Sequence, residues 1–180
     1  CFNMGTIEGV SNAVRMLKNN FMPEVTNSLR ESEDLIHDLI TDQLMAGLDE
    51  NGKQIRPTYL QDSYFREKAA RKKAMWWRDM KERITPPETS NLLKFPPRNR
   101  NTPNLIITGE YHRSITPIVI DGKDGGKIIT RSIGFYAGDN ALEEKYGPSH
   151  LGLTRKAKKY LLDNRIKPAI ESLLKKYGFK

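Results

Sequence analysis

The chain has few of the residues that build covalent or metal-held frameworks. Of its 180 residues one is cysteine and three are histidine. A single cysteine, Cys1, excludes a disulfide within one subunit and a zinc site made of several cysteine thiolates. The histidines, His37, His112 and His150, have no i, i+4 spacing with another ligand, so the zinc hydrolase motif is absent. We therefore expect no metal, no cofactor and a reducing compartment.

Long apolar runs are also missing. No stretch approaches 18 consecutive apolar residues, so we expect no membrane span. The first residues lack a basic region followed by an apolar core, so we expect no signal peptide and synthesis in the cytosol. The length predicts one domain, or one domain with an arm. Because 37% of the residues are hydrophobic and 29% are charged, part of the chain is expected to pack against a partner.

The net charge of +8 is unevenly distributed along the chain. Residues 1–61 hold nine acids against five bases, residues 66–83 eight bases against three acids, and residues 154–180 nine bases against two acids. Such asymmetry predicts an anionic partner, either nucleic acid or an acidic protein. Solvated helix faces have the same pattern, and charge alone does not separate the two interpretations.

Residues 1–56 are predicted to be a helical N-terminal part. Apolar side chains recur every three or four positions over residues 6–21, which places them on one stripe of a helix. These are Ile7, Val10, Val14, Leu17 and Phe21. Pro23 is expected to end this helix and begin a second one over residues 23–45. Residues 49–52 predict a turn rather than a calcium loop, because Gly52 follows Asp49 too closely for an EF-hand.

Residues 57–103 are predicted to be a basic helix followed by a Pro-rich arm. The helix covers residues 64–83, where aromatic residues are interleaved with basic ones that could stack on bases and neutralise phosphates. Trp76 and Trp77 are adjacent, however, and point about 100° apart on a helix, so they cannot form one stacking platform. We favour one of them in the core and the other against a neighbouring subunit. Five prolines between Pro86 and Pro103 predict an extended segment over residues 85–104.

Residues 104–180 are predicted to hold the sheet. Two β-rich runs, 115–120 and 127–135, flank a Gly- and Asp-rich turn and predict a hairpin, with Pro117 at an edge or a bulge. A short helix is expected over residues 141–146, after Asp139 as its cap and before Gly147. A basic helix follows from Thr154, and Pro168 is expected to kink or split it. The predicted class is α+β, with N-terminal helices, a small antiparallel sheet, a long C-terminal helix packed over it and the extended basic arm.

The order of short motifs in this last part resembles the neck and tail-completion proteins of tailed phages. Leu105, Thr108, Gly109, Ser114 and Ile115 match a pattern that precedes the hairpin in that family, and Glu144, Tyr146 and Gly147 match an acidic-aromatic-Gly turn that follows it. Residues 43–52 and 151–154 also look like segments of uncharacterised phage and prophage proteins. The long basic, Pro-rich insertion departs from the shorter family members.

The resemblance implies a structural virion protein without catalytic activity. Copies would form a homo-oligomeric ring, a head-to-tail connector, between the portal and the tail, in contact with portal, neck and tail proteins and with DNA in the channel. The protein would be made in the bacterial host cytoplasm. The alternative is a basic DNA-binding accessory protein of phage or mobile-element origin. The residues predicted to contact a partner or DNA are Arg66, Arg71, Lys72, Lys73, Trp76, Trp77, Arg78, Arg98, Arg100, Lys156, Lys158 and Lys159.

Two enzymatic interpretations are weaker. His112 lies near Glu110 and Ser114 in the sequence, but alternate positions of a short helix or turn do not bring the three side chains into a relay. A nuclease site would need Asp121, Asp124 and Glu143 gathered on one metal, whereas aspartates of Gly-rich hairpins usually form turns. We therefore predict that the protein is not an enzyme.

Overall fold

The computed structural model describes residues 6–63, 90–106, 109–122 and 125–179. The predicted basic helix, with Arg66, Arg71, Lys72, Lys73, Trp76, Trp77 and Arg78, lies outside these ranges, as do Thr108 and Asp124. The chain divides into two compact units. Unit 1 combines Cys1–Leu35, Pro117–Ile129 and Lys159–Lys180, and unit 2 combines Ile36–Thr116 and Thr130–Lys158.

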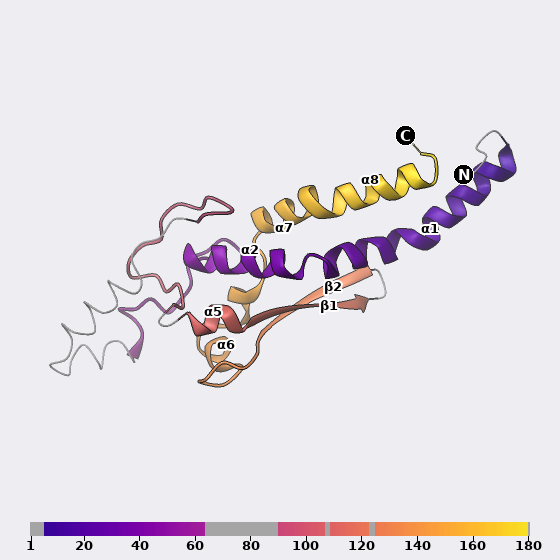
Figure 1. Cartoon of the computed structure of the whole chain (residues 1–180). Helices are drawn as coiled ribbons and strands as arrows, with labels where there is room; N and C mark the ends of the chain where they lie inside the picture. Colours follow the sequence, from indigo (N-terminus) through magenta and orange to yellow (C-terminus); the bar gives the residue numbers. More distant parts are fainter. Residues whose placement is uncertain (1–5, 64–89, 107–108, 123–124, 180) are drawn as a thin grey trace. The chain divides into compact units, whose positions relative to one another are not determined.

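The predicted α+β class is confirmed, with helices and a two-stranded antiparallel sheet (Figure 1). The elements are α1 (Ile7–Arg30), α2 (Glu33–Met45), α5 (Glu110–Ser114), β1 (Ile115–Gly122), β2 (Gly125–Ser132), α6 (Ala141–Tyr146), the 3-10 turn η1 (Pro148–Leu151), α7 (Arg155–Leu161), the π turn η2 (Leu162–Ile166) and α8 (Lys167–Lys176). The predicted hairpin and the predicted helix at 141–146 are both present. The arm residues 90–106 contain no helix or strand.

Helix α1 begins as predicted but does not end at Pro23. Thr6 caps its first turn, because its hydroxyl oxygen accepts a hydrogen bond from the backbone N–H of Gly9 at 3.1 Å. The helix continues through Pro23 to Arg30. A proline inside a helix costs about 3 kcal/mol. Thr26, Ser28 and Leu29, which follow it, are buried, and their packing offsets that cost. The predicted helix break at Pro23 was therefore wrong.

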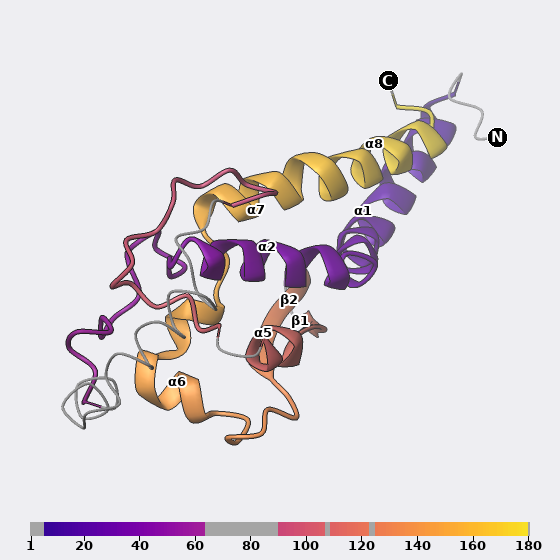
Figure 2. The ribbon, with the colours of Figure 1, turned by 60° about the vertical axis from the view of Figure 1, so that its left-hand side comes forward.

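In unit 1, α8 packs along α1 (Figures 1 and 2). Pro168 lacks an N–H group, and the helix leaves α geometry in the π turn η2 directly before α8. The predicted irregularity at Pro168 is confirmed. The hydroxyl of Ser28 donates a hydrogen bond of 3.3 Å to the carbonyl of Arg165 in this turn. The buried apolar side chains of unit 1 are Ala13, Leu29, Val119, Leu161, Ile166, Leu173 and Tyr177.

The hairpin contacts α1 through a glycine and an ion pair. A Cβ atom on Gly126 would lie 3.1 Å from Leu29 and 3.2 Å from Thr26, so the missing side chain lets the strand approach the helix. At the end of α1, Arg30 donates to the carboxylate of Asp121 at 2.7 Å. These contacts join the hairpin to α1 within unit 1.

Unit 2 is built on the apolar face of α2. Ile36, Leu39, Ile40 and Leu44 are completely buried. The helix α6 ends at Gly147, whose φ of 81° suits glycine, as predicted. Asp139 is not its cap, because Asn140 precedes the first turn. The carboxylate of Asp139 instead accepts a hydrogen bond from the backbone N–H of Gly134 at 2.7 Å.

Candidate functional site

Residues of the resemblance motif form the junction between α5 and β1 in unit 2. Gly109 precedes α5 with φ of 82°. The hydroxyl of Ser114 is buried and donates to the carbonyl of Tyr111 at 2.7 Å. The carbonyl of Ser114 accepts the backbone N–H of Ile133 at 2.8 Å, and Ile115 begins the strand. Leu105 is also buried, so these residues hold the unit together rather than face solvent.

The three histidines, which are distant in the sequence, form hydrogen bonds within unit 2, where His112 and His150 are buried and His37 is half-buried. Nε2 of His37 lies 2.9 Å from the carbonyl of His112, and Nε2 of His112 lies 2.8 Å from the carbonyl of Asn104. Because a carbonyl only accepts, each of these nitrogens donates. Nδ1 of His150 likewise donates to the carbonyl of Gly147, which leaves its Nε2 to accept the hydroxyl of Tyr111. His112 and Ser114 each bond to a backbone carbonyl, not to each other.

Burial sets the protonation of His112, His150 and Tyr111. It lowers the pKa of His112 from 6.5 to about 4, an effect that the carbonyl of Asn104 opposes and nearby His37 adds to. It also lowers the pKa of His150. Burial, together with the charge of Glu143, raises the pKa of Tyr111 far above its usual value. The neutral imidazoles of His112 and His150 and the neutral phenol of Tyr111 are therefore the stable forms. Among the described residues, no group of three His, Cys, Asp or Glu side chains could hold a metal ion.

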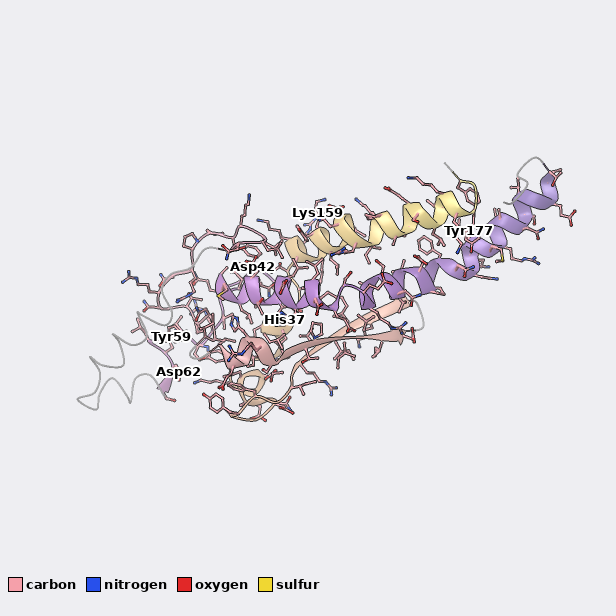
Figure 3. All side chains as sticks on the ribbon, viewed as in Figure 1. His37, Asp42, Tyr59, Asp62, Lys159 and Tyr177 are labelled. Carbon is pink, nitrogen blue, oxygen red and sulfur yellow. The ribbon has the colours of Figure 1, made fainter. Side chains whose placement is uncertain are left out.

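Asp42 on α2 anchors the described end of the arm (Figure 3). Its buried carboxylate accepts the backbone N–H groups of Asn91 and Leu93, each at 2.8 Å, and the hydroxyl of Ser90. The next residue, Gln43, is completely buried and bonds to Gly152 and Thr154. Neither pairing could be predicted from the sequence, in which only two polar residues beside the apolar face of a helix are visible.

The predicted contact residues of the arm lie in different surroundings. Arg98 is only 5% exposed, and its guanidinium donates to the carbonyls of Asn99, Arg100 and Thr102. It therefore holds its own loop together and does not present its charge at the surface. Arg100 is exposed.

The predicted contact residues of α7 are all exposed. The ammonium of Lys156 lies 5.0 Å from the centre of the Phe95 ring. Lys159 pairs with Asp163 at 2.6 Å, and the same carboxylate pairs with Lys167 at 2.5 Å. Asp163 thus neutralises part of the positive charge of unit 1, while Lys156 and Lys158 in unit 2 remain at the surface.

An apolar stripe on α1 is exposed, although its period also fits a buried face. Ile7 is 92% exposed, Val10 40% and Val14 50%. These residues stand at i, i+3 and i+7, so they share one side of the helix. Two further isoleucines, Ile118 and Ile120, are exposed at alternate positions of β1 and so lie on one face of that strand. The sequence pattern alone cannot show that these surfaces remain uncovered.

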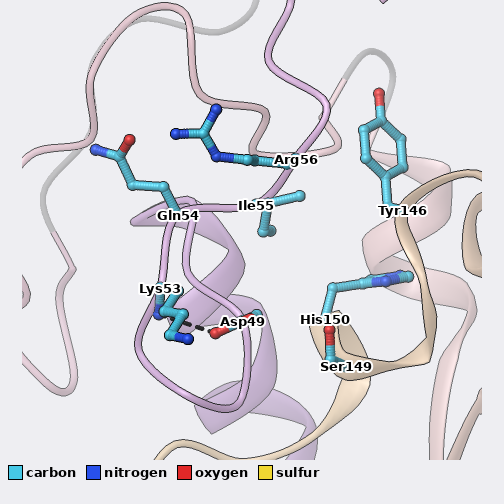
Figure 4. A pocket seen from close by; sticks show the side chains of 8 residues that line it. All are labelled: Asp49, Lys53, Gln54, Ile55, Arg56, Tyr146, Ser149 and His150. Atoms are coloured by element: carbon cyan, nitrogen blue, oxygen red, sulfur yellow. Dashed lines mark hydrogen bonds between the residues drawn. The ribbon is translucent and has the colours of Figure 1, made fainter.

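A pocket of about 540 Å³ lies within unit 2 (Figure 4). It is lined by Asp49, Lys53, Gln54, Ile55, Arg56, Tyr146, Ser149 and His150. Asp49, the first residue of the predicted turn at residues 49–52, belongs to this lining. Here the carboxylate of Asp49 accepts the backbone N–H groups of Asn51 at 2.9 Å and Lys53 at 2.8 Å.

No family model, no curated protein and no solved structure matches this chain. In the part of the chain that the structure describes, none of the helices has the length and apolar character needed to cross a bilayer. The surfaces described above, the apolar stripe, the basic side chains and the pocket, are therefore what a functional proposal rests on.

Proposed function

We propose that the protein is a structural component of a tailed-phage virion, which assembles into a ring in the neck between portal and tail. The apolar stripe of Ile7, Val10 and Val14 carries this proposal. Single exposed apolar residues are common on any protein, but a contiguous set on one side of a helix is typical of a protein interface. Covering the stripe with another subunit would remove it from water.

A second apolar surface supports a head-to-tail contact. Ile118 and Ile120 are exposed on β1, an element separate from the stripe on α1. A ring requires two different surfaces on each subunit, because each copy must contact one neighbour on each side. The stripe and the outer face of β1 would supply these two surfaces. The motif residues Gly109, Ser114 and Ile115 would then serve the fold and not the contact.

The alternative function, a DNA-binding accessory protein, is favoured by the exposed lysines of α7. Lys156 and Lys158 are exposed in unit 2 and Lys159 in unit 1. Each phosphate that such a lysine neutralises releases a counterion, so binding would weaken steeply with salt. In the ring, the same side chains would line the DNA channel or contact an acidic partner.

Quantitative mass spectrometry of purified particles tests the proposal. The amount of this chain is scaled to that of the portal protein in the same particles. We expect a small fixed ratio, because a closed ring has a defined copy number. If the protein is abundant in infected cells but absent from particles, the structural role is wrong and DNA binding becomes the better explanation.

A further inference from the structure

The carboxylate of Glu143, on α6, is buried, although the residue as a whole is half-buried. In the described part of the chain, neither of its two oxygens has a hydrogen-bond partner. A carboxylate that is removed from water without a donor is unfavourable, so its surroundings must explain it. The next residue of the same helix, Glu144, is exposed. The unusual surroundings therefore belong to Glu143 and not to the acids of α6 in general.

The hydroxyl of Tyr111, on α5, lies between two acceptors. Burial raises the pKa of Tyr111, and the charge and hydrogen-bonding capacity of the Glu143 carboxylate add to this effect, which places the two groups side by side. The same hydroxyl contacts Nε2 of His150, whose Nδ1 donates to the carbonyl of Gly147. A phenol has one proton to donate. While His150 is neutral, Nε2 receives that proton and the carboxylate does not.

The charge of Glu143 also acts on His150. Burial lowers the pKa of this imidazole, whereas its hydrogen bond to Gly147 and the charge of Glu143 raise it. The other titratable or charged side chains around the three groups are Tyr146 on α6, His112 beside Tyr111, and the pocket residues Asp49, Lys53 and Arg56. The acid whose charge favours the imidazolium form of His150 is thus Glu143.

We propose that Glu143, Tyr111 and His150 form a buried site that binds one proton. The proton comes from solvent and binds Nε2 of His150, which then donates to the oxygen of Tyr111 where it had accepted from it. The phenol keeps its own proton and turns it towards the carboxylate of Glu143. The imidazolium and the carboxylate then balance each other in charge, and each donor of the three side chains has an acceptor.

Proton uptake extends the hydrogen bonding between the elements of unit 2. In the neutral form, Tyr111 joins α5 to η1 through His150. In the protonated form, the chain of hydrogen bonds runs from the carbonyl of Gly147 through His150 and Tyr111 to Glu143 on α6. His150 also lines the pocket (Figure 4), so its charge develops beside that surface. Uptake occurs below pH 6.5, because burial lowers the pKa of His150.

An NMR titration of the full chain, from about pH 8 down to the start of acid unfolding, tests the site without mutation. Nε2 of His150 should change from an acceptor to a donor nitrogen. The side-chain carbon signals of Tyr111 and Glu143 should shift at the same pH, because interacting groups titrate as one system. Separate midpoints for the three residues, or a His150 that stays neutral until the chain unfolds, would overturn the proposal.

Glu143→Gln removes the negative charge and keeps the shape of the side chain. We expect His150 to take up its proton at a pH at least about one unit lower, because a nearby opposite charge favours the charged form of an imidazole. Glu144→Gln is the matched control, since it removes an exposed acid from the next position of the same helix. It should move the midpoint by about 0.3 pH units or less. Equal changes in the two variants would mean that general negative charge is responsible, and the site would be wrong.

Tyr111→Phe separates the relay through the phenol from direct attraction between the two charges. It removes the hydroxyl and keeps the ring, whose centre lies 5.3 Å from that of Phe135. We expect a lower midpoint for His150, as in Glu143→Gln, because Nε2 of the imidazolium loses its acceptor. A midpoint equal to that of the unmodified chain contradicts the relay. If a substitution at either position prevents folding, the titration of the unmodified chain still decides.

The proton site lies entirely within unit 2 and shares no residue with the apolar stripe of unit 1. The proposal therefore goes beyond ring assembly and does not depend on it. Failure of proton uptake leaves the particle measurement unaffected, and absence from particles leaves the proton site unaffected.

Discussion

Gln43 and Thr154 are joined by a hydrogen bond across 111 residues of sequence. The backbone N–H of Thr154 donates to Oε1 of Gln43 at 2.8 Å, while Nε2 of Gln43 donates to the carbonyl of Gly152, also at 2.8 Å. One buried amide thus satisfies a donor and an acceptor of the backbone that leads into α7. Thr154 in turn caps this helix, since its hydroxyl oxygen accepts the N–H of Ala157 at 3.2 Å.

Replacing Gln43 by leucine should therefore destabilise unit 2. The change leaves the buried N–H of Thr154 and the part-buried carbonyl of Gly152 without this partner, at a cost of up to about 1–3 kcal/mol for each unsatisfied group. We expect the free energy of unfolding, measured with urea, to fall by about 2–4 kcal/mol. Gln54→Leu is the matched control, because Gln54 is exposed, and it should change stability by about 0.5 kcal/mol or less. Equal losses of stability in the two variants would show that the hydrogen bonds of the buried Gln43 amide do not stabilise the fold.

Asp42 should fix the start of the arm segment at residues 90–93. In Asp42→Ala, the N–H groups of Asn91 and Leu93 lose their acceptor. We expect a loss of about 1–3 kcal/mol in stability and faster hydrogen exchange at Leu93. Asp38→Ala on the same helix is the control, because the Asp38 side chain is 68% exposed. If exchange at Leu93 is the same in both variants, the carboxylate of Asp42 does not hold this segment.

Local signals explain which parts of the fold could be predicted. Gly147 and Pro148 end α6 where the sequence indicated, because a glycine with positive φ is a property of the turn itself. The end of α1 could not be predicted from the residues around Pro23 alone. Pro23 marks a break by its own chemistry, but the helix continues because Leu29, six residues later, is buried. Whether the helix ends at Pro23 or continues through it is decided by the packing of the residues that follow.

The candidate site was less accessible to sequence reasoning. The pocket brings Lys53 and Arg56 together with Tyr146 and His150, which lie about 90 positions further along the chain. The spacing of residues along the chain does not predict which distant residues line the same pocket. Arg98 illustrates the opposite problem: its charge suggested a surface contact, but its guanidinium is buried among carbonyls of its own loop. Charge in a sequence does not show on which side of a loop the side chain lies.

The buried imidazole of His112 should make the protein sensitive to acid. Burial lowers its pKa from 6.5 to about 4 in the folded chain, so the unfolded chain binds a proton at a higher pH than the folded chain does. Stability should be greatest above pH 6.5 and should fall as the pH decreases towards 4, by at most about 3 kcal/mol from this group. The measurement is urea unfolding at several pH values between 4 and 8.

His112→Gln removes this titration while keeping an amide that can donate to the carbonyl of Asn104. The variant should lose stability overall but show a shallower decrease between pH 6.5 and 4. The lowered pKa of His150 acts in the same direction, so the slope should be reduced and not abolished. A slope equal to that of the unmodified protein, or an NMR titration of His112 near pH 6.5, would contradict the assignment.

The apolar stripe of α1 should be the contact through which copies associate. Val14→Glu places a charge in the middle of the stripe, and a buried, unpaired carboxylate is strongly unfavourable at an interface. We expect self-association, measured by sedimentation, to weaken by about 2 kcal/mol or more, roughly thirtyfold. Asn19→Glu adds the same side chain to the same helix, five residues or about 140° further round, at an exposed polar position.

The comparison of these two variants separates the stripe from general effects of negative charge. Both substitutions make exposed positions of one helix acidic, so both chains should fold. If only Val14→Glu remains monomeric under conditions where the unmodified chain associates, the stripe is the contact surface. If Asn19→Glu dissociates equally, added charge is responsible, and if the unmodified chain shows no association at any concentration, the stripe does not join copies of this protein. Ring assembly would then need a contact other than the one that the exposed residues of α1 indicate.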